Sequence, residues 1–461
     1  MSFPRIPRQR FPTQPTVAVV LRPAVTGIPT SHSQTSTGED LFPVVATEPR
    51  LGSLFTARVV ALAVICLPVL VPAFPFNLAP ADAPLLVAVV AFALGAGWAG
   101  EKLTAPFAIP VWIIVTAGSL AALTGQFPAQ GAVAVAQDLY LFLWCATVAN
   151  VMRTPAAMRV VLRAWTLSAT ASAALLVGAV ATRQWSIAGV GSGSTRAAFT
   201  FGEQNGAALY FVVSILIVLA TRSPYHRILR AVAVAVLVAA LVATGSLAGL
   251  LGLGTGLGVA AVIVVRDRVG YQAAIAVLVG VVLVGALVLY GVSRTGFADR
   301  VKASPNVYVR NSIGREDQSK SEREVLARET TALYKSGGVL GRGPGSTKDT
   351  LAAEQASYQK EAHDDWVAAL VERGVVGLLG VLLLAVAIAM RAAGVSRTRQ
   401  LTPGYRRVVR TPAFVVGALV TVLVFSLTHE ALHDRTVWTL LGLLAAMYAW
   451  GRQPALEEVS K

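Results

Sequence analysis

The sequence predicts an all-α, polytopic membrane protein with about twelve transmembrane helices and one large extracytoplasmic loop. Three observations predict this class. Of the 461 residues, 55% are hydrophobic and only 14% are charged. Apolar runs of about 20 residues, the length that crosses a bilayer, alternate with short polar connections. One long polar segment, residues 293–362, interrupts the pattern. A soluble globular protein of ordinary composition is therefore excluded.

The apolar runs define the predicted elements in chain order. Residues 1–55 are rich in proline, serine and threonine and lack an apolar signal-peptide core, so we expect a disordered cytoplasmic tail that is not cleaved. Spans 1–9 fill residues 56–292, the loop domain follows at 293–362, spans 10–12 occupy 363–451, and 452–461 form a short cytoplasmic tail. The individual runs centre on residues 57–78, 84–100, 106–124, 131–152, 160–181, 206–221, 228–245, 247–265, 272–292, 366–390, 413–429 and 436–451.

The distribution of charge predicts the orientation. The formal net charge is +15, and arginines gather in alternate connections, most densely between residues 391 and 410. The positive-inside rule makes these connections cytoplasmic, which places both termini inside and the 293–362 loop outside. No basic patch is interleaved with aromatic residues, so nucleic-acid binding is not expected. Cys66 and Cys145 lie in apolar runs and predict neither a disulfide framework nor a metal site.

Polar residues suited to one kind of chemistry gather in the predicted outer connections. Arg196, Glu203 and Asn205 lie directly before the sixth span, Arg323 lies in the long loop, and His363 stands at the head of the tenth span. Arginine presents planar, bidentate donors that stay charged, so two arginines converging over one cavity would suit a diphosphate. The alternative for each arginine is a salt bridge to a loop carboxylate, and for the histidine a helix cap or a surface position.

Three short motifs follow one another in these connections. They are Arg196 with Gly202-Glu203-Gln204-Asn205, Arg323 with the glycine turn Gly341-Arg342-Gly343-Pro344-Gly345, and His363 with Trp366 and Glu372-Arg373-Gly374-Val375-Val376-Gly377. In this order, from about Arg196 to Met390, the chain resembles the O-antigen ligase and polymerase family of integral membrane enzymes. One departure is Asp364, because the family commonly has asparagine after the histidine.

The resemblance implies a metal-independent, glycosyltransferase-type enzyme of cell-envelope polysaccharide synthesis. Such an enzyme transfers a glycan from a polyprenyl-diphosphate carrier, such as undecaprenyl diphosphate, to an acceptor hydroxyl at the outer face of the plasma membrane. By the same resemblance, His363 is the catalytic base, and Arg196 and Arg323 bind the diphosphate. Further residues are expected to support the site: Glu203, Asn205, Asp364 and Glu430.

The resemblance also predicts the partners of the protein. It implies a lipid-linked oligosaccharide or polysaccharide donor, a glycan, lipid or protein acceptor, and contact with membrane lipids, with no metal ion or other cofactor. A ligase and a polymerase share the motifs, so the sequence leaves these two reactions open.

Two other functions fit parts of the sequence. Residues 429–433 read His-Glu-Ala-Leu-His, and on a helix this pattern would present two zinc ligands and a glutamate base, as in a membrane zinc protease. We prefer a polar cap over the cavity, because no third ligand lies nearby in the sequence. A multi-span transporter of an anionic or lipid-linked substrate is the other alternative, although two six-span halves would place the long connection after the sixth span. Asp138, inside the fourth span, is either functional or the partner of an arginine.

Overall fold

The structure is a computed structural model that describes most of the chain, namely residues 53–71, 79–190, 196–305, 325, 328–335, 339–355 and 364–452. Secondary structure in these stretches is helical, apart from an isolated bridge between Leu401 and Arg452. The all-α part of the predicted class is thus confirmed. The predictions for the N-terminal tail up to residue 52, for Arg323 and for His363 fall outside the described residues.

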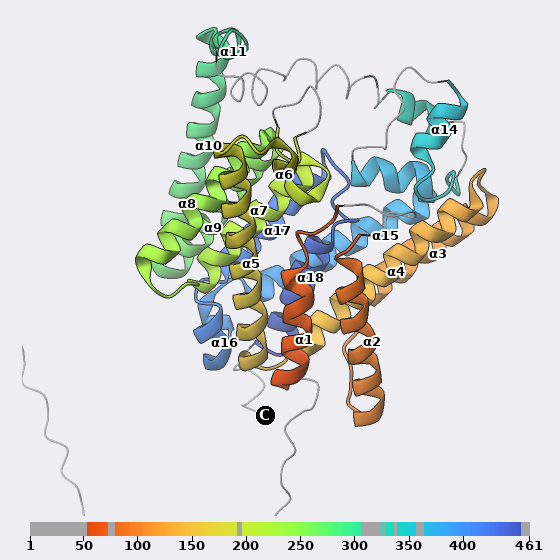
Figure 1. Ribbon diagram of the computed structural model, residues 1–461, viewed down its shortest axis with the longest axis horizontal. Helices are drawn as coiled ribbons and strands as arrows, with labels where there is room; N and C mark the ends of the chain where they lie inside the picture. Colours follow the sequence, from red (N-terminus) through yellow and green to blue (C-terminus); the bar gives the residue numbers. More distant parts are fainter. Residues whose placement is uncertain are drawn as a thin grey trace, which may run out of the picture. The chain divides into compact units, whose positions relative to one another are not determined.

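The described helices follow one another through short turns. The long helices between residues 204 and 294 lie on one side of the bundle, and those over residues 108–151 and 365–395 lie on the other (Figure 1). In chain order the elements are α1 (Leu54–Ile65), α2 (Asp82–Ala99), α3 (Ala108–Thr124), α4 (Pro128–Val151), α5 (Pro155–Ala181), α6 (Trp185–Ala188), the 3-10 helix η3 (Phe199–Phe201), α7 (Gln204–Thr221), α8 (Arg227–Thr244), α9 (Leu247–Arg268), α10 (Tyr271–Arg294), α11 (Phe297–Lys302), α14 (Thr347–Ala353), α15 (Asp365–Val395), the 3-10 helix η4 (Thr398–Gln400), α16 (Pro403–Val408), α17 (Ala413–Ser426) and α18 (Arg435–Ala449).

The first predicted run departs from the others. We expected one span over residues 57–78, but α1 ends at Ile65 and a turn follows. Pro68 explains the early end, because proline lacks a backbone N–H and disfavours helical conformation at the residue before it. Beyond the turn, the amides of Leu70 and Val71 both donate to the carbonyl oxygen of Thr200, at 2.8 and 2.9 Å. The end of this run is therefore tied to the segment that carries Arg196.

The helices are those of a membrane protein by length and composition. Six helices in the described part of the chain are long and apolar enough to cross a membrane, namely α4, α5, α7, α8, α9 and α15. The apolar parts of α1, α2, α3, α10, α17 and α18 are shorter, at 10–17 residues. The total of about twelve spans, and the position of residues 293–362 outside the membrane, stay predictions.

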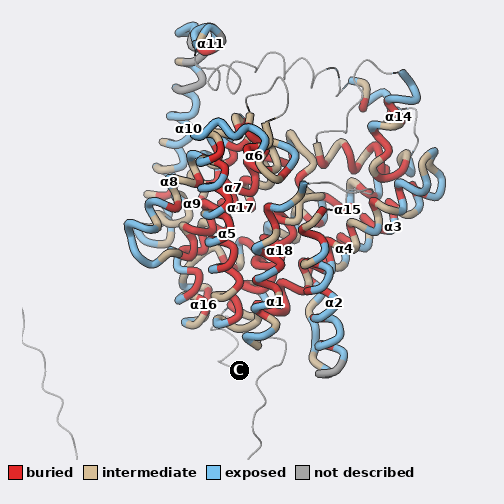
Figure 2. Tube along the Cα trace, viewed as in Figure 1, coloured by how far each residue is buried: buried red, intermediate tan, exposed pale blue. Residues whose placement is uncertain are grey.

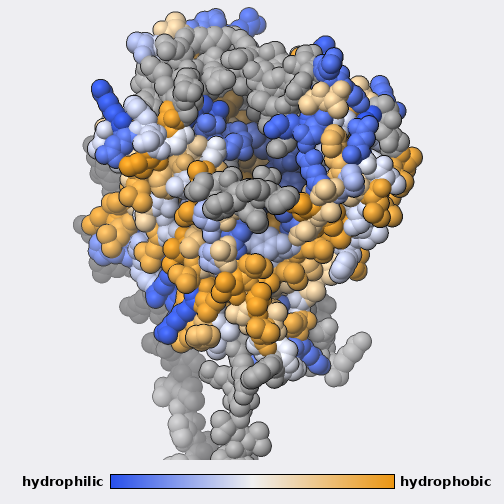
Figure 3. Space-filling view, turned by 45° about the vertical axis from the view of Figure 1, so that its right-hand side comes forward, coloured by the Kyte–Doolittle hydropathy of each residue, from blue (hydrophilic) through white to orange (hydrophobic). Residues whose placement is uncertain are grey.

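The outer surface of the bundle is apolar where a lipid bilayer would touch it. Figure 2 shows exposed stretches along α2 and α10, and on these helices the exposed side chains include Leu86, Val87, Leu94, Val282 and Leu287. In Figure 3 apolar side chains form a broad area over the middle of the visible face, and hydrophilic ones gather above it. Exposed apolar patches of this extent indicate contact with lipid rather than with water.

The core surrounds α7, and 78% of the residues of this helix are buried. A helix that is apolar on every side is expected at the centre of a bundle. Helix α7 packs against α5, α8, α9 and α17, and elsewhere in the bundle α15 packs on α3, α1 on α5, and α18 on α4. Two buried tryptophans find partners across these contacts: Trp144 Nε1 donates to Thr439 Oγ1 at 2.8 Å, and Trp165 Nε1 donates to Ser214 Oγ at 3.0 Å. The packing brings the C-terminal helix α18 against α4, which positions the site.

Candidate functional site

The glycine turn of residues 341–345 is joined to a break in α15. Gly374 has φ 67° and ψ −168°, so the helix is interrupted there and loses part of its own hydrogen-bond ladder. The turn replaces the lost bonds: the amides of Arg342 and Gly343 donate to the carbonyls of Val371 and Glu372, at 2.9 and 3.0 Å. A Cβ on Gly341 would lie 2.6 Å from the carbonyl oxygen of Glu372, so only glycine fits this approach.

The side chain of Glu372 also joins α15 to the glycine turn, and we call this contact region the junction. Its carboxylate accepts from the amide of Gly345 at 2.8 Å and from Thr347 Oγ1 at 2.6 Å, which also fixes the start of α14. Gln130 Nε2, on α4, donates to the carbonyl of Gly345 at 2.6 Å. The Glu-Arg-Gly motif of the sequence thus holds the glycine turn against both α15 and α4.

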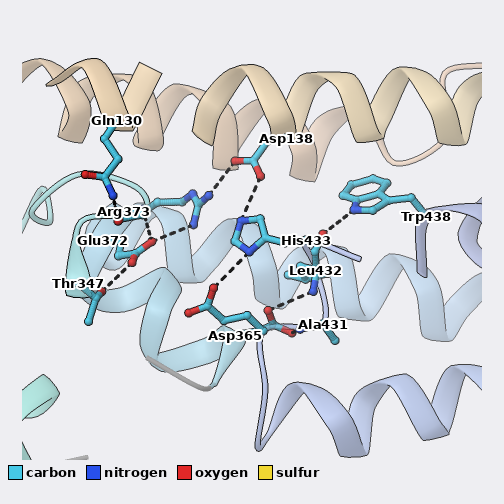
Figure 4. A network of polar contacts seen from close by, with 12 residues as sticks. Gln130, Asp138, Thr347, Asp365, Glu372, Arg373, Ala431, Leu432, His433 and Trp438 are labelled. Atoms are coloured by element: carbon cyan, nitrogen blue, oxygen red, sulfur yellow. Dashed lines mark hydrogen bonds and ion pairs between the residues drawn. The ribbon is translucent and has the colours of Figure 1, made fainter. Parts of the chain in front are cut away.

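Arg373 connects this junction to α4 inside the bundle (Figure 4). Its Nη2 lies 2.8 Å from Asp138 Oδ2 of α4, and its Nη1 lies 3.8 Å from Glu372. Asp138 also faces His433 at 3.8 Å, and His433 Nδ1 lies 3.3 Å from Glu430. Asp138 was predicted to be either functional or an arginine's partner, and the structure shows that it is paired with Arg373. A buried ion pair of this kind requires both members, because either charge alone would be desolvated without compensation.

The surroundings of His433 favour its protonated form. Burial disfavours the charged imidazolium, but the hydrogen bond to Glu430 and the negative charges of Glu430 and Asp138 outweigh it and raise the pKa of His433 to about 9. The histidine is therefore cationic at neutral pH, and it bridges carboxylates from α4 and from the turn before α18.

The His-Glu-Ala-Leu-His segment does not form the helix that a zinc protease needs. Residues 427–434 form turns between α17 and α18, so the two histidines do not share a helical face. His429 Nδ1 lies 3.0 Å from Thr428 Oγ1, whereas His433 turns to Asp138 and Glu430. Within the described stretches, no group of three or more His, Cys, Asp and Glu side chains is arranged to hold a metal ion. The geometry does not support the zinc-protease alternative.

The head of α15 is fastened to the same turn. Asp364, a predicted supporting residue, is the N-cap of α15, and its Oδ1 accepts from the amides of Trp366 and Val367 at 2.8 and 3.0 Å. Asp365 accepts from the amides of Ala431 and Leu432, at 3.0 and 3.2 Å. His363 itself lies outside the described residues, but the residues that follow it in the chain are anchored to the 427–434 turn.

Arg196, Glu203 and Asn205 form a connected polar group before α7. Arg196 donates from Nε to the carbonyl of Thr244 at 3.0 Å and from Nη2 to Asn205 Oδ1 at 3.2 Å. The same Asn205 oxygen accepts from Ser246 Oγ at 2.9 Å, and Asn205 Nδ2 donates to Glu203 at 3.2 Å. These contacts orient the amide of Asn205, because its oxygen meets two donors and its nitrogen meets a carboxylate.

Electrostatics link this group to the turn before α18. Burial raises the pKa of Asp434, and the negative charge of Glu203 raises it further, so the two carboxylates lie in one electrostatic environment. The next residue, Arg435, makes two hydrogen bonds to Asp82, from Nε at 2.6 Å and from Nη2 at 2.5 Å. The structure therefore joins the head of α15 to the 427–434 turn through Asp365, whereas the convergence of Arg196 with Arg323 and His363 stays a prediction.

A small cavity lies beside the ion pairs. It has a volume of about 30 Å³, and its walls include Asp138, Asp365, Arg373 and His433 together with Trp438. That volume accommodates about one water molecule and is too small for a sugar. The network is therefore a support behind the polar region and not itself the place where a glycan binds.

The apolar helices define a multi-helix membrane protein. Comparison with protein families gives the next step: a family model described as O-antigen ligase matches residues 232–382. The match confirms the resemblance seen in the sequence and supports assignment of the chain to the O-antigen ligase and polymerase family. The family implies a glycosyltransferase-type membrane enzyme with a lipid-linked glycan and an acceptor as partners. No curated protein matches the chain.

The sequence did not identify every residue of the polar region. Arg373 and Glu372 were noted as part of a motif, but their contacts with Asp138 and with the glycine turn were not predicted. The available signal was the presence of two ionisable residues beside a long apolar run, which is costly unless they are paired. His433 was grouped with His429, although the two side chains have different partners.

Proposed function

We propose that this protein transfers a glycan from a polyprenyl-diphosphate carrier to an acceptor hydroxyl at the outer face of the plasma membrane, as a cell-envelope polysaccharide ligase or polymerase. The observation that carries the proposal is the family match over residues 232–382, which includes Arg323, the glycine turn and His363. Arg196 and Asn205 lie outside the matched stretch, and the contacts of the described residues support their inclusion.

The proposed reaction forms a bond between the acceptor oxygen and the anomeric carbon of the glycan while the bond to the diphosphate breaks. His363 accepts the proton that the acceptor hydroxyl loses. Arg196 and Arg323 stabilise the negative charge that develops on the departing diphosphate. The carrier leaves as a polyprenyl diphosphate, so charge and atoms balance without a redox step.

The surroundings of Arg196 suit this role. Two of its hydrogen bonds go to the oxygens of Thr244 and Asn205 and hold the guanidinium in place. Glu203 contacts Asn205 and so acts on Arg196 through the amide. A guanidinium held in this way loses less side-chain entropy when it binds an anion.

The experiment compares variants of the full chain in a deletion strain and after purification. His363→Ala should lower turnover by about 10²–10⁴-fold while carrier binding is retained. Arg196→Ala should weaken carrier binding, and Arg196→Lys should remain damaging because a single ammonium lacks the bidentate fork. His226→Ala and Arg183→Lys are matched controls, because both residues are exposed and distant in sequence from the motifs.

The carrier-linked glycan in cell extracts, measured by mass spectrometry, gives the readout. Accumulation in the His363 and Arg196 variants but not in the controls supports the proposal. Full-length glycan left on its carrier identifies a ligase, and shortened chains identify a polymerase. A His363→Ala protein that turns over at the wild-type rate would refute the assignment of the base. A purified protein that moves lipid-linked glycan across a vesicle membrane without transferring it would instead identify a transporter.

A further inference from the structure

A second polar feature lies at the end of the bundle remote from α11 and α14, around α16 (Figure 1). There an open cavity of about 540 Å³ is lined by Arg222, Pro403, Arg406, Arg407 and Arg410. The cavity lies between the end of α7 and the segment that joins α15 to α17. Its volume is in the range of small-molecule sites. None of the residues that line it belongs to the polar region proposed for glycan transfer.

The charges in this cavity are unbalanced. All four ionisable lining residues are arginines, and no carboxylate lines the cavity. Among the described residues none of the four makes a salt bridge, and Arg406 Nε is buried without a hydrogen-bond partner. Arg153, by contrast, is matched by Glu101 at 2.5 Å. A cavity lined by four guanidiniums and no carboxylate favours an anion.

The arginines are held in place by contacts of the surrounding backbone. The amide of Thr411 donates to the carbonyl of Ala220 at 3.0 Å, which fixes the segment of Arg410 against the end of α7. Tyr405 Oη donates to the carbonyl of Met152 at 3.0 Å and anchors α16 to the turn before α5. Arg410 also stacks on the ring of Tyr225, with its Cζ 5.2 Å from the ring centroid. The fold thus gathers these like charges at one place.

We propose that this arginine pocket, defined by Arg222, Arg406, Arg407 and Arg410, binds phosphate oxygens. Guanidiniums match phosphate through parallel hydrogen bonds, and several of them can share a single phosphate group. Two sources supply this chemistry: the headgroup of an anionic phospholipid, and a soluble diphosphate. Basic pockets between membrane helices on the predicted cytoplasmic side are suited to lipid headgroups. The positive-inside rule explains arginines at this end, but it does not require four of them to line one cavity.

The test measures binding to the purified full chain in nanodiscs of phosphatidylcholine. One arm titrates short-chain phosphatidylglycerol, and the other titrates inorganic pyrophosphate at constant ionic strength. The test variant is R406Q/R407Q. The matched control is R227Q/R268Q, which removes the same charge from exposed arginines that do not line the cavity. If each arginine contributes about fivefold to phosphate affinity, the test variant should lose about 25-fold and the control less than about twofold.

The outcomes separate the sources and decide the proposal. Selective loss with phosphatidylglycerol identifies a lipid headgroup, and selective loss with pyrophosphate identifies a soluble phosphate; either result supports the pocket. Equal losses in the two variants would show that only general surface charge is involved, and absence of binding by both probes would overturn the proposal. If R406Q/R407Q does not fold, as judged by its melting temperature, R406K/R407K against R227K/R268K replaces it. The lysine pair should lose affinity through the missing fork alone.

Discussion

Replacing Asp138 with asparagine should destabilise the protein by about 3 kcal/mol. Asp138 and Arg373 are 12% and 6% exposed, and their closest atoms lie 2.8 Å apart, so the pair is desolvated. Removing one partner of such a pair costs about 3–5 kcal/mol, because the other charge stays buried without compensation. The lower figure applies here, since Arg373 would keep Glu372 at 3.8 Å. Asp138→Leu with Arg373→Met should cost less than the two single changes together, by about 2 kcal/mol.

The assay follows tryptophan fluorescence during detergent-driven unfolding of the purified protein. Asp267→Asn is the control, because Asp267 lies 3.8 Å from Arg399, whose side chain is 70% exposed. An exposed pair of this kind contributes about 0–1 kcal/mol. The reasoning fails if Asp138→Asn costs no more than Asp267→Asn. It also fails if the double change at Asp138 and Arg373 costs the full sum of the single changes, since the two residues would then be energetically independent.

Three further predictions test the junction, the charged turn and the orientation. Gly374→Ala should reduce both folded yield and thermal stability, because a Cβ at φ +67° would overlap the carbonyl of Val339, whereas Gly254→Ala meets nothing within 4 Å and should be tolerated. The pKa of His433, raised from 6.5 to about 9, predicts stabilisation that is fully present below about pH 6.5 and lost as the pH rises through about 9. Melting temperatures across that window should show the loss, and His433→Gln should flatten the profile. Reporter fusions at Arg268 and Lys348 should report the cytoplasm and the exterior respectively; the reverse result would contradict the predicted topology.

The apolar pattern alone determined most of the helices. Runs predicted at 106–124 and 247–265 correspond to α3 and α9, whose bounds are Ala108–Thr124 and Leu247–Arg268. The agreement has a physical reason: in a bilayer each backbone polar group must be satisfied within its own segment, so a long apolar run has little choice but to be helical. The structure adds that Asp364 caps the head of α15, where its carboxylate accepts from free amides.

Only the tertiary structure decided which polar groups meet. Asp138 and Arg373 are far apart in the sequence, and nothing local to either residue indicates the other. The break at Gly374 depends on the approach of Val339 from the preceding loop, and the Glu372 carboxylate finds its donors only because that loop folds back. The histidine pattern of residues 429–433 suggested a zinc helix, but the turn before α18 and the charge of Asp138 direct His433 elsewhere. Partners of this kind are set by helix packing, because a buried charge must find compensation wherever the fold supplies it.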